Sequence, residues 1–520
     1  MSISRVSLFL AGQILSVAVI LVVWELLARS LAGTYTVAGP VAVGSHIVAN
    51  VSVLLRALVA TLKSASLGYL CGNLAAIVLA GTALLLPLAE RPIRLLSLVV
   101  FCLPLIATGP ILRVLYGPGI GPQVTLSALS VFYTTLIPLL AGLRAAPSVW
   151  LELVESYGRG SWTKLVHVRA MASLPYLIAG LQIAAPAAFL GALIGEFTGA
   201  ERGLGVLTLR AMRQLDTDAT WAIAAIAASI SIVAYALAGL LGRVIWPGAA
   251  PVLLVPPGKS NRRPWDRVIP VLLIPVVFVL WYVIMESLGL NRFFAKRPDD
   301  IWNFLVQDES ARKHRETLGA ALLETLSTVL PGYFAGLILG AGLAALCILL
   351  PWVARVVSPV SVTMRAVPIV TTAPLIVLWL GREAAGVITI VAVMIFFPTL
   401  IACLQGMRLA PKAVLDVFES YGSNKLQTLI YARVPASLPA FFASARIAVP
   451  AAVLAATVAE WLATGKGIGN LMALSASTSD YNMLWSAIFA LTVVAVLAHG
   501  LVGWAEEAVF ARYAPEQLQD

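Results

Sequence analysis

The sequence predicts an all-α polytopic membrane protein with about 12 transmembrane helices, arranged as two parallel six-helix repeats. Its 520 residues are 60% hydrophobic and only 12% charged, whereas a soluble domain carries about 25% charged residues. This excess of apolar residues cannot be buried in a water-soluble core, so lipid must surround most of the chain. Only helices and closed barrels satisfy the backbone in a bilayer, and the apolar runs are continuous rather than alternating, which indicates helices.

The second observation is an internal repeat that extends over most of the chain. A shift of 264 residues matches the sequence to itself without a gap, as from position 155 to position 419. The tetrapeptide ESYG occurs at 155–158 and again at 419–422, and the register holds through glycines, prolines and charged residues on both sides. The protein is therefore a tandem duplication, and the functional site is expected where the two copies meet.

Each copy contains six apolar runs of about 20 residues, the length of a helix that crosses a bilayer. In the first copy the runs are 8–27, 64–86, 95–115, 123–143, 173–195 and 219–241. In the second copy they are 268–288, 326–350, 357–380, 384–404, 437–459 and 484–501. Because six is an even number, both copies should cross the membrane in the same direction.

These runs also predict the domain organisation. We assign 1–246 to the first repeat, 247–267 to a cytoplasmic linker and 268–520 to the second repeat, each repeat with six transmembrane helices. The first run lacks a small-residue cleavage site, so it is interpreted as a retained helix and not as a signal peptide.

The net charge of +10 raises the alternative of a nucleic-acid-binding protein. Membrane proteins, however, concentrate Lys and Arg in cytoplasmic loops. The basic residues here gather in the linker, between runs two and three, and between runs four and five. These segments lie on one side of the predicted topology, so we place that side and both termini in the cytoplasm and expect no nucleic-acid partner. A further basic cluster between runs seven and eight falls on the predicted outer side.

Neither cysteine nor histidine indicates a metal site. The four cysteines lie inside apolar runs without a CxxC pattern, and the four histidines are scattered without ligand spacing. The cysteines are interpreted as small buried residues, and no metal ligand is expected.

The loop between runs four and five carries the same pattern in both copies: an acidic residue, a helical stretch, and a glycine six positions after the acidic residue. The residues concerned are Glu152, Glu155 and Gly158 in the first copy and Asp416, Glu419 and Gly422 in the second. Glycine allows a turn that other residues resist, so each loop should be a helix–turn–helix on the cytoplasmic face. Its apolar residues favour docking of another protein over simple packing on the membrane surface, because nothing else in this chain is an obvious partner for them.

This loop, followed in the second copy by Val434 and Pro435, resembles the EAA loop of permease subunits in bacterial ABC importers that work with a binding protein. The stretch ALIGEF at 192–197 and the stretch AEWL at 459–462, each followed by a GxG sequence, resemble the sulfonate, nitrate and taurine branch of that family. The resemblance covers nearly all of both copies. It implies a fold like that of a type I ABC importer permease, with two permease subunits fused into one multi-pass protein of the bacterial plasma membrane.

In that family the loop is a coupling helix that sits in a groove of the ATPase subunit, which gives a coupling role to the six loop residues named above and to Pro435. The resemblance implies two copies of an ABC ATPase subunit and a periplasmic or lipid-anchored substrate-binding protein as partners. This chain has no GxxxxGK[ST] phosphate loop, so ATP and Mg²⁺ are expected on the partner ATPase. No cofactor and no catalytic residue are expected in this chain.

The same resemblance implies a small solute: an anion such as a sulfonate or nitrate, or a small heterocycle. The two loops depart from the family pattern in different ways, so their coupling is expected to be unequal. The first copy has Ala170 and Met171 where the second has the expected Val434 and Pro435.

A twelve-helix secondary transporter is an alternative, because that class also has two parallel six-span halves. Such transporters usually carry an elaborate loop between spans two and three, whereas that loop is short here, at 89–92. A membrane-embedded enzyme is disfavoured, since the apolar runs contain no paired acids, histidine cluster or nucleophile.

Charged residues inside apolar runs are candidates for the transport path, because a charge in a membrane is costly. Glu196 and Glu460 occupy equivalent places at the outer ends of the fifth runs, and Arg446 aligns with Gln182. We predict that these four residues line a path that favours an anion. A structural role at helix interfaces is the alternative.

Overall fold

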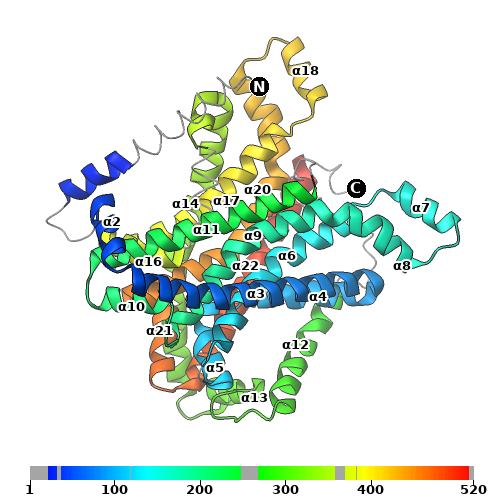
Figure 1. Cartoon of the computed structure of the whole chain (residues 1–520). Coiled ribbons are helices and arrows are strands. Elements are labelled where there is room, and N and C mark those ends of the chain that lie inside the picture. Colours follow the sequence, from blue (N-terminus) through cyan, green and yellow to red (C-terminus); the bar gives the residue numbers. More distant parts are fainter. Residues whose placement is uncertain are drawn as a thin grey trace.

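The computed structural model describes residues 21–31, 37–117, 119–246, 268–357, 369–381 and 383–513, and all regular elements in these ranges are helices (Figure 1). Within them, eight helices are long and apolar enough to cross a membrane, and a bent pair would make a ninth. The eight are α3 (Val51–Leu85), α6 (Gly121–Arg144), Ser161–Phe197, α11 (Thr217–Ile245), α14 (Ala311–Leu349), α17 (Ala384–Arg408), Lys425–Thr464 and α22 (Tyr481–Tyr513). The prediction of an all-α polytopic membrane protein is confirmed.

The third run of the first copy differs from its prediction as one span over 95–115. It forms two helices, α4 (Pro87–Cys102) and α5 (Leu105–Tyr116), which meet at an angle of 95°. Leu103 between them is extended, at φ −64° and ψ 133°, because the residue before a proline is driven out of the helical region. In the second copy only α16 (Ile369–Leu380) is described for this run.

The structure describes part of the first run and nearly all of the seventh. Residues 21–30, which include the end of the first run, are helical, and their Trp24 packs against Trp221 of α11 with ring centroids 5.4 Å apart. The seventh run forms α12 (Val268–Ser287). The predicted linker at 247–267 lies outside the described residues, so the domain boundaries stay a prediction.

The duplication is visible as a repeat of elements at one constant spacing. α5 recurs as α16, and α10 (Leu204–Arg213) recurs as α21 (Gly467–Ser477). The fifth helix of the first copy consists of the π-helical turn η2 (Leu165–Arg169) and α9 (Ala170–Phe197). Its counterpart consists of η5 (Leu429–Arg433), α20 (Val434–Ala459) and η6 (Glu460–Thr464). Further short helices are α2 (Pro40–Ala49), α13 (Pro298–Trp302) and η4 (Asn303–Gln307).

The second and fourth helices of each copy approach closely along a row of small residues. A Cβ atom added at Gly332 would lie 2.7 Å from Val391, and one at Gly336 would lie 2.7 Å from the carbonyl oxygen of Ala392. Gly72 of α3 meets the backbone of α6 in the same way, at 2.5 Å. Helices in lipid associate through close van der Waals packing of small residues, which explains the repeated glycines here.

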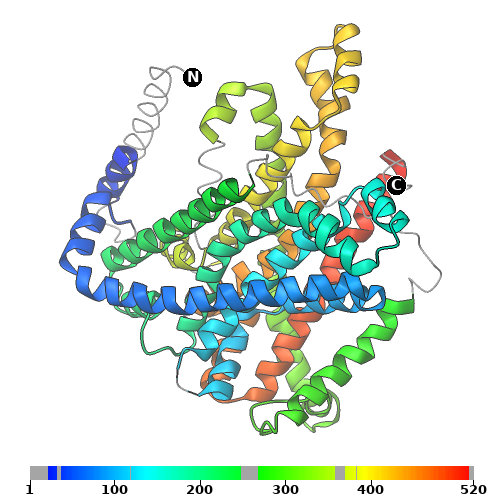
Figure 2. The ribbon, with the colours of Figure 1, turned by 45° about the vertical axis from the view of Figure 1, so that its right-hand side comes forward.

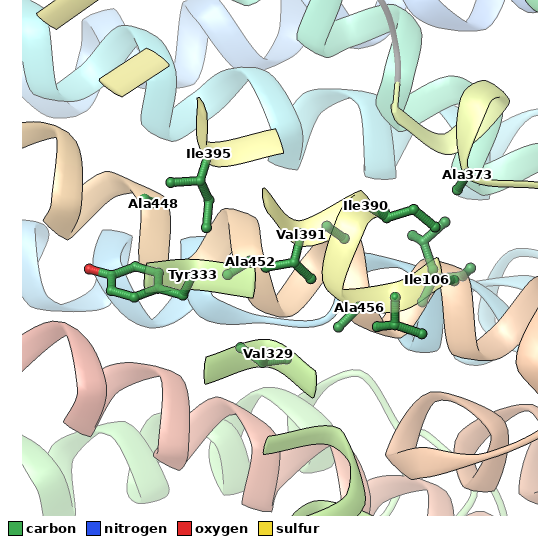
Figure 3. Packing of buried hydrophobic residues seen from close by; sticks show 14 of the residues in the cluster. Ile106, Val329, Tyr333, Ala373, Ile390, Val391, Ile395, Ala448, Ala452 and Ala456 are labelled. Atoms are coloured by element: carbon green, nitrogen blue, oxygen red, sulfur yellow. The ribbon is translucent and has the colours of Figure 1, made fainter. Parts of the chain in front are cut away.

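The two copies are joined mainly through their third runs. α5 of the first copy packs on α20, α21 and α22, and α16 of the second copy packs on α9 and α11. Figure 3 shows Ile106 of α5 beside Ile390 and Ala373 of the second copy, in one buried cluster. Each third run therefore crosses into the other copy and contacts its fifth and sixth helices.

The long helices of the two copies cross instead of forming a parallel bundle. α3 runs across the molecule in both views, whereas α22 is steeply inclined to it (Figures 1 and 2). Two helical hairpins project beyond the long helices, one at α7–α8 and one at α18. They are the loops between the fourth and fifth helices.

Candidate functional site: two exposed helical hairpins

The two hairpins have the same backbone. In the first copy α7 (Ser148–Ser156) is followed by a turn, then by α8 (Ser161–Lys164) and η2. In the second copy α18 (Lys412–Ser420), α19 (Lys425–Thr428) and η5 have the same lengths at the repeat spacing. This confirms that the predicted helix–turn–helix occurs twice.

A glycine ends the first helix of each hairpin. Gly158 and Gly422 both have φ +68°, in the left-handed region where a side chain is strained. The amide of Gly158 donates to the Glu155 carbonyl at 2.8 Å, and the amide of Arg159 donates to the Val154 carbonyl at 3.2 Å. These two bonds form a Schellman motif. The equivalent bonds at Gly422 and the next residue are both 3.0 Å long.

The hairpins expose apolar side chains that nothing in the described chain covers. No residue of α7 or α18 is buried. Tyr157 is 75% exposed and Tyr421 is 85% exposed, at equivalent positions beside the two turns. Trp150 and Trp162 are also mostly exposed, on the two arms of the first hairpin. Large aromatic side chains on a projecting element are typical of the anchors of a protein–protein interface.

The polar contacts that close the hairpins differ between the copies. In the first, the Lys164 ammonium donates to the Glu155 carboxylate at 2.8 Å and links α8 to α7. This hydrogen bond and the positive charge lower the pKa of Glu155 below its ordinary value. In the second, Asn424 and Gln427 form a capping box within α19, with bonds of 2.8 and 3.0 Å.

Three further residues of the predicted coupling loops lie on or next to the hairpins. Glu152 and Asp416 are exposed on α7 and α18. Pro435 lies in the first turn of α20, inside the continuous helical segment Lys425–Thr464. The second arm of each hairpin runs on through a π-helical turn into the fifth helix, and this turn is also present in the first copy, which lacks the proline.

Glu196 and Glu460 are buried within their own copies. The Glu460 carboxylate accepts hydrogen bonds from the Thr325 hydroxyl at 2.9 Å and the Gly469 amide at 2.8 Å. The Glu196 carboxylate accepts from the Gly205 amide at 2.7 Å. Each glutamate therefore ties the end of the fifth helix to the GxG turn after it. These contacts favour the structural role that the sequence left open, and a role in the transport path stays a prediction.

Arg446 and Gln182 also face partners in their own copies. Arg446 lies 3.2 Å from the Glu506 carboxylate on α22, so its charge is paired. Gln182 donates to the Tyr235 carbonyl on α11 at 3.4 Å. The structure does not bring the four predicted path residues into one cluster, because each glutamate contacts its own GxG turn and the other two face the sixth helices.

Sequence reasoning missed a difference between the copies near the hairpins. Glu90 pairs with Arg94 at 2.9 Å and with Arg144, whereas the second copy has Ala354 in the place of Glu90. The signal was available, because the internal alignment juxtaposes Glu90 and Ala354. No cluster of potential metal ligands occurs among the described residues.

An all-α polytopic chain with two such hairpins defines a transport permease. The profile of the family described as "Binding-protein-dependent transport system inner membrane component" matches residues 72–247 and 332–511, together more than half of the chain. The chain belongs to this family and contains its domain twice. It is a component of an ABC importer and a multi-pass inner membrane protein, as its apolar helices and its relatives both indicate.

Three relatives are permease proteins by name. The chain is 28% identical over 235 residues to a probable ABC transporter permease protein of Haemophilus influenzae, a match that covers 45% of this chain and 94% of the relative. It is 25% identical over 241 residues to the formylaminopyrimidine transport permease protein ThiX of Halalkalibacterium halodurans, covering 46% and 94%. It is 21% identical over 223 residues to the taurine transport system permease protein TauC of Escherichia coli, covering 43% and 81%. Each relative corresponds in length to about one copy.

Proposed function

We propose that this chain forms by itself the whole translocation path of an ABC importer, with each hairpin docking one copy of a separate ATPase subunit. The observation that carries the proposal is the repeated hairpin: two turns of the same geometry, each with an uncovered aromatic residue beside it. A soluble partner that binds both hairpins would cover these aromatic side chains and exclude water from them. ATP and Mg²⁺ would be held by that partner.

The hairpins also support the orientation in the membrane. An ATPase subunit that uses cellular ATP has to bind on the cytoplasmic side, so the face with α7 and α18 is assigned to the cytoplasm, together with both termini. A periplasmic or lipid-anchored binding protein would then deliver the solute to the opposite face.

The solute is proposed to be small, either an anion or a heterocycle. The support comes from the relatives, whose names include a formylaminopyrimidine, taurine and nitrate transporter. Arg446 adds less support for an anion than its sequence position suggested, since Glu506 neutralises it.

Copurification with the cognate ATPase subunit tests the docking. Tyr157→Ala and Tyr421→Ala should each weaken the complex, because an interface aromatic anchor contributes about 2 kcal/mol, or roughly thirtyfold in affinity. Trp302→Ala is the matched control, because Trp302 is 60% exposed on α13, between the seventh and eighth runs. Equal recovery of the ATPase with all three variants, or ATP hydrolysis by the purified chain alone, would contradict the proposal.

A further inference from the structure

An open cavity of about 300 Å³ lies at the hairpin end of the second copy. Three arginines line it: Arg355 on the helical segment 351–357, Arg408 at the end of α17, and Arg433 at the end of η5. The remaining lining residues are uncharged, including Cys347 and Ala354. We call this cavity the arginine hollow. Among its described lining residues there is no carboxylate.

At the equivalent position in the first copy, a carboxylate balances part of the positive charge. The counterparts of the three arginines are Arg91, Arg144 and Arg169. There Glu90 stands in the position of Ala354 and pairs with Arg144, and also with Arg94 at 2.9 Å. The duplication has kept the three arginines in both copies, but the carboxylate is found only in the first.

The arginine hollow therefore gathers positive charge that the described protein does not neutralise. Arginine stays protonated in proteins, and like charges at short range repel. Arg433 donates one hydrogen bond to the Met407 carbonyl at 3.1 Å, and Arg408 lies in the last turn of α17, where the helix dipole favours a cation. The carbonyl group and the helix dipole offset only part of the positive charge of three guanidinium groups, and neither is a carboxylate.

The surroundings of the hollow indicate where a balancing anion would come from. The hollow lies where the apolar helices α14 and α17 end, and the ends of membrane-crossing helices are where lipid headgroups are expected. Trp352 and Val356, one helical turn apart beside Arg355, are 60% and 62% exposed. Trp is enriched at the membrane–water interface, and an exposed apolar pair next to a basic cavity is suited to an acyl chain beside its headgroup.

We propose that the arginine hollow binds the phosphate headgroup of an anionic phospholipid. Guanidinium groups match phosphate oxygens in geometry and charge, and basic pockets between transmembrane helices bind acidic headgroups. The leaflet is the cytoplasmic one, an assignment that rests on the proposed function. The equivalent place in the first copy is filled by the internal Glu90 carboxylate, so one such lipid site is expected per chain.

The test introduces the missing carboxylate. Ala354→Glu would place in the second copy the residue that pairs with Arg144 in the first, and Ala354→Gln is the matched control of equal size without charge. The full chain in detergent would be incubated with phosphatidylglycerol or with phosphatidylcholine, and retained lipid would be counted by native mass spectrometry. We expect the wild type and Ala354→Gln to retain phosphatidylglycerol over phosphatidylcholine, and Ala354→Glu to lose at least about fivefold of that retention.

Equal retention of phosphatidylglycerol by all three proteins would overturn the proposal. Because Ala354 is largely buried, Arg355→Gln serves as a second variant at an exposed position, with the same expected loss. Thermal stabilisation by inorganic phosphate that disappears in Ala354→Glu, without lipid retention in the wild type, would assign the hollow to a soluble anion instead. The lipid measurement contains no ATPase subunit. A negative lipid result therefore does not contradict the docking proposal, and a negative docking result does not contradict lipid binding.

Discussion

The two copies have similar backbone conformations but differ in their ion pairs. The repeated backbone features build the fold, and the ion pairs that differ are the features that can distinguish the two halves. Leu215 and Ser479, at equivalent positions, both have positive φ, and the aspartate after each caps the next helix. The GxG turns and the hairpin turns are likewise repeated. By contrast, Glu90, Lys164 and the Arg446–Glu506 pair each occur in one copy only.

Substitutions in the repeated GxG turns should have the largest effect, and they test whether the two copies are structurally equivalent. Gly203 and Gly467 both have positive φ, and a Cβ atom there would lie 2.1 and 2.4 Å from the Glu196 and Glu460 carboxylates. Gly203→Val and Gly467→Val should each destabilise the protein by about 3 kcal/mol or more, through backbone strain and a clash with a buried carboxylate. Yield of folded protein and thermal unfolding in detergent would measure this. If only one variant were damaged, the two turns would not be equivalent.

The hairpin turns should show the next largest effect. Gly158→Val and Gly422→Val impose the same strain, about 1–2 kcal/mol, because the φ angles are equal and no atom lies within 4 Å of either added Cβ. The first hairpin keeps the Glu155–Lys164 bond between its arms, so we expect a larger loss of ATP-driven uptake from Gly422→Val. Uptake into proteoliposomes with the cognate ATPase tests this. An equal loss would remove the predicted inequality of the two loops.

The Arg446–Glu506 pair separates a role in the solute path from a role in packing. Arg446→Gln alone leaves Glu506 unpaired, and the added change Glu506→Gly makes this place resemble the first copy, which has Gln182 and Gly242. We expect a coupling energy of about 1 kcal/mol in unfolding, since Arg446 is partly exposed. Uptake of an anion that falls in both variants would support a path residue. Full recovery in the double variant would limit the pair to packing.

The smallest effect concerns pH and the first hairpin. Because the folded-state pKa of Glu155 lies below 4.5, its ion pair with Lys164 is present above that pH and is lost as pH falls through the lowered value. Hydrogen exchange of α7 should therefore stay slow from neutral pH down through the ordinary carboxyl range and increase only when the pH falls through the lowered pKa of Glu155, after correction for intrinsic exchange. Lys164→Met should abolish this step, and α18 should lack it. A step of the same size in α18 would contradict the assignment.

The sequence was sufficient to predict the fold class, because a chain in lipid needs long apolar helices and because the duplication shows each apolar run twice. It predicted the hairpins from Gly158 and Gly422, whose conformation few other residues adopt. The prediction of a single span over 95–115 was wrong, because hydropathy does not register the effect of Pro104. The residue before this proline is extended, and the chain bends there. The sequence also did not predict the ion pair of Arg446 with Glu506, because the two residues meet only through the packing of α20 on α22.

The stoichiometry of the assembled transporter tests most directly whether each hairpin docks its own ATPase subunit. Single cysteines at Tyr157 and at Tyr421, in a chain whose exposed Cys71 is replaced by serine, would be cross-linked to the cognate ATPase and the intact complex weighed by native mass spectrometry. We predict one chain with two ATPase subunits, and a cross-link from each position to a different subunit. A complex with a single ATPase subunit, or cross-links from only one of the two hairpins, would contradict two equivalent docking sites.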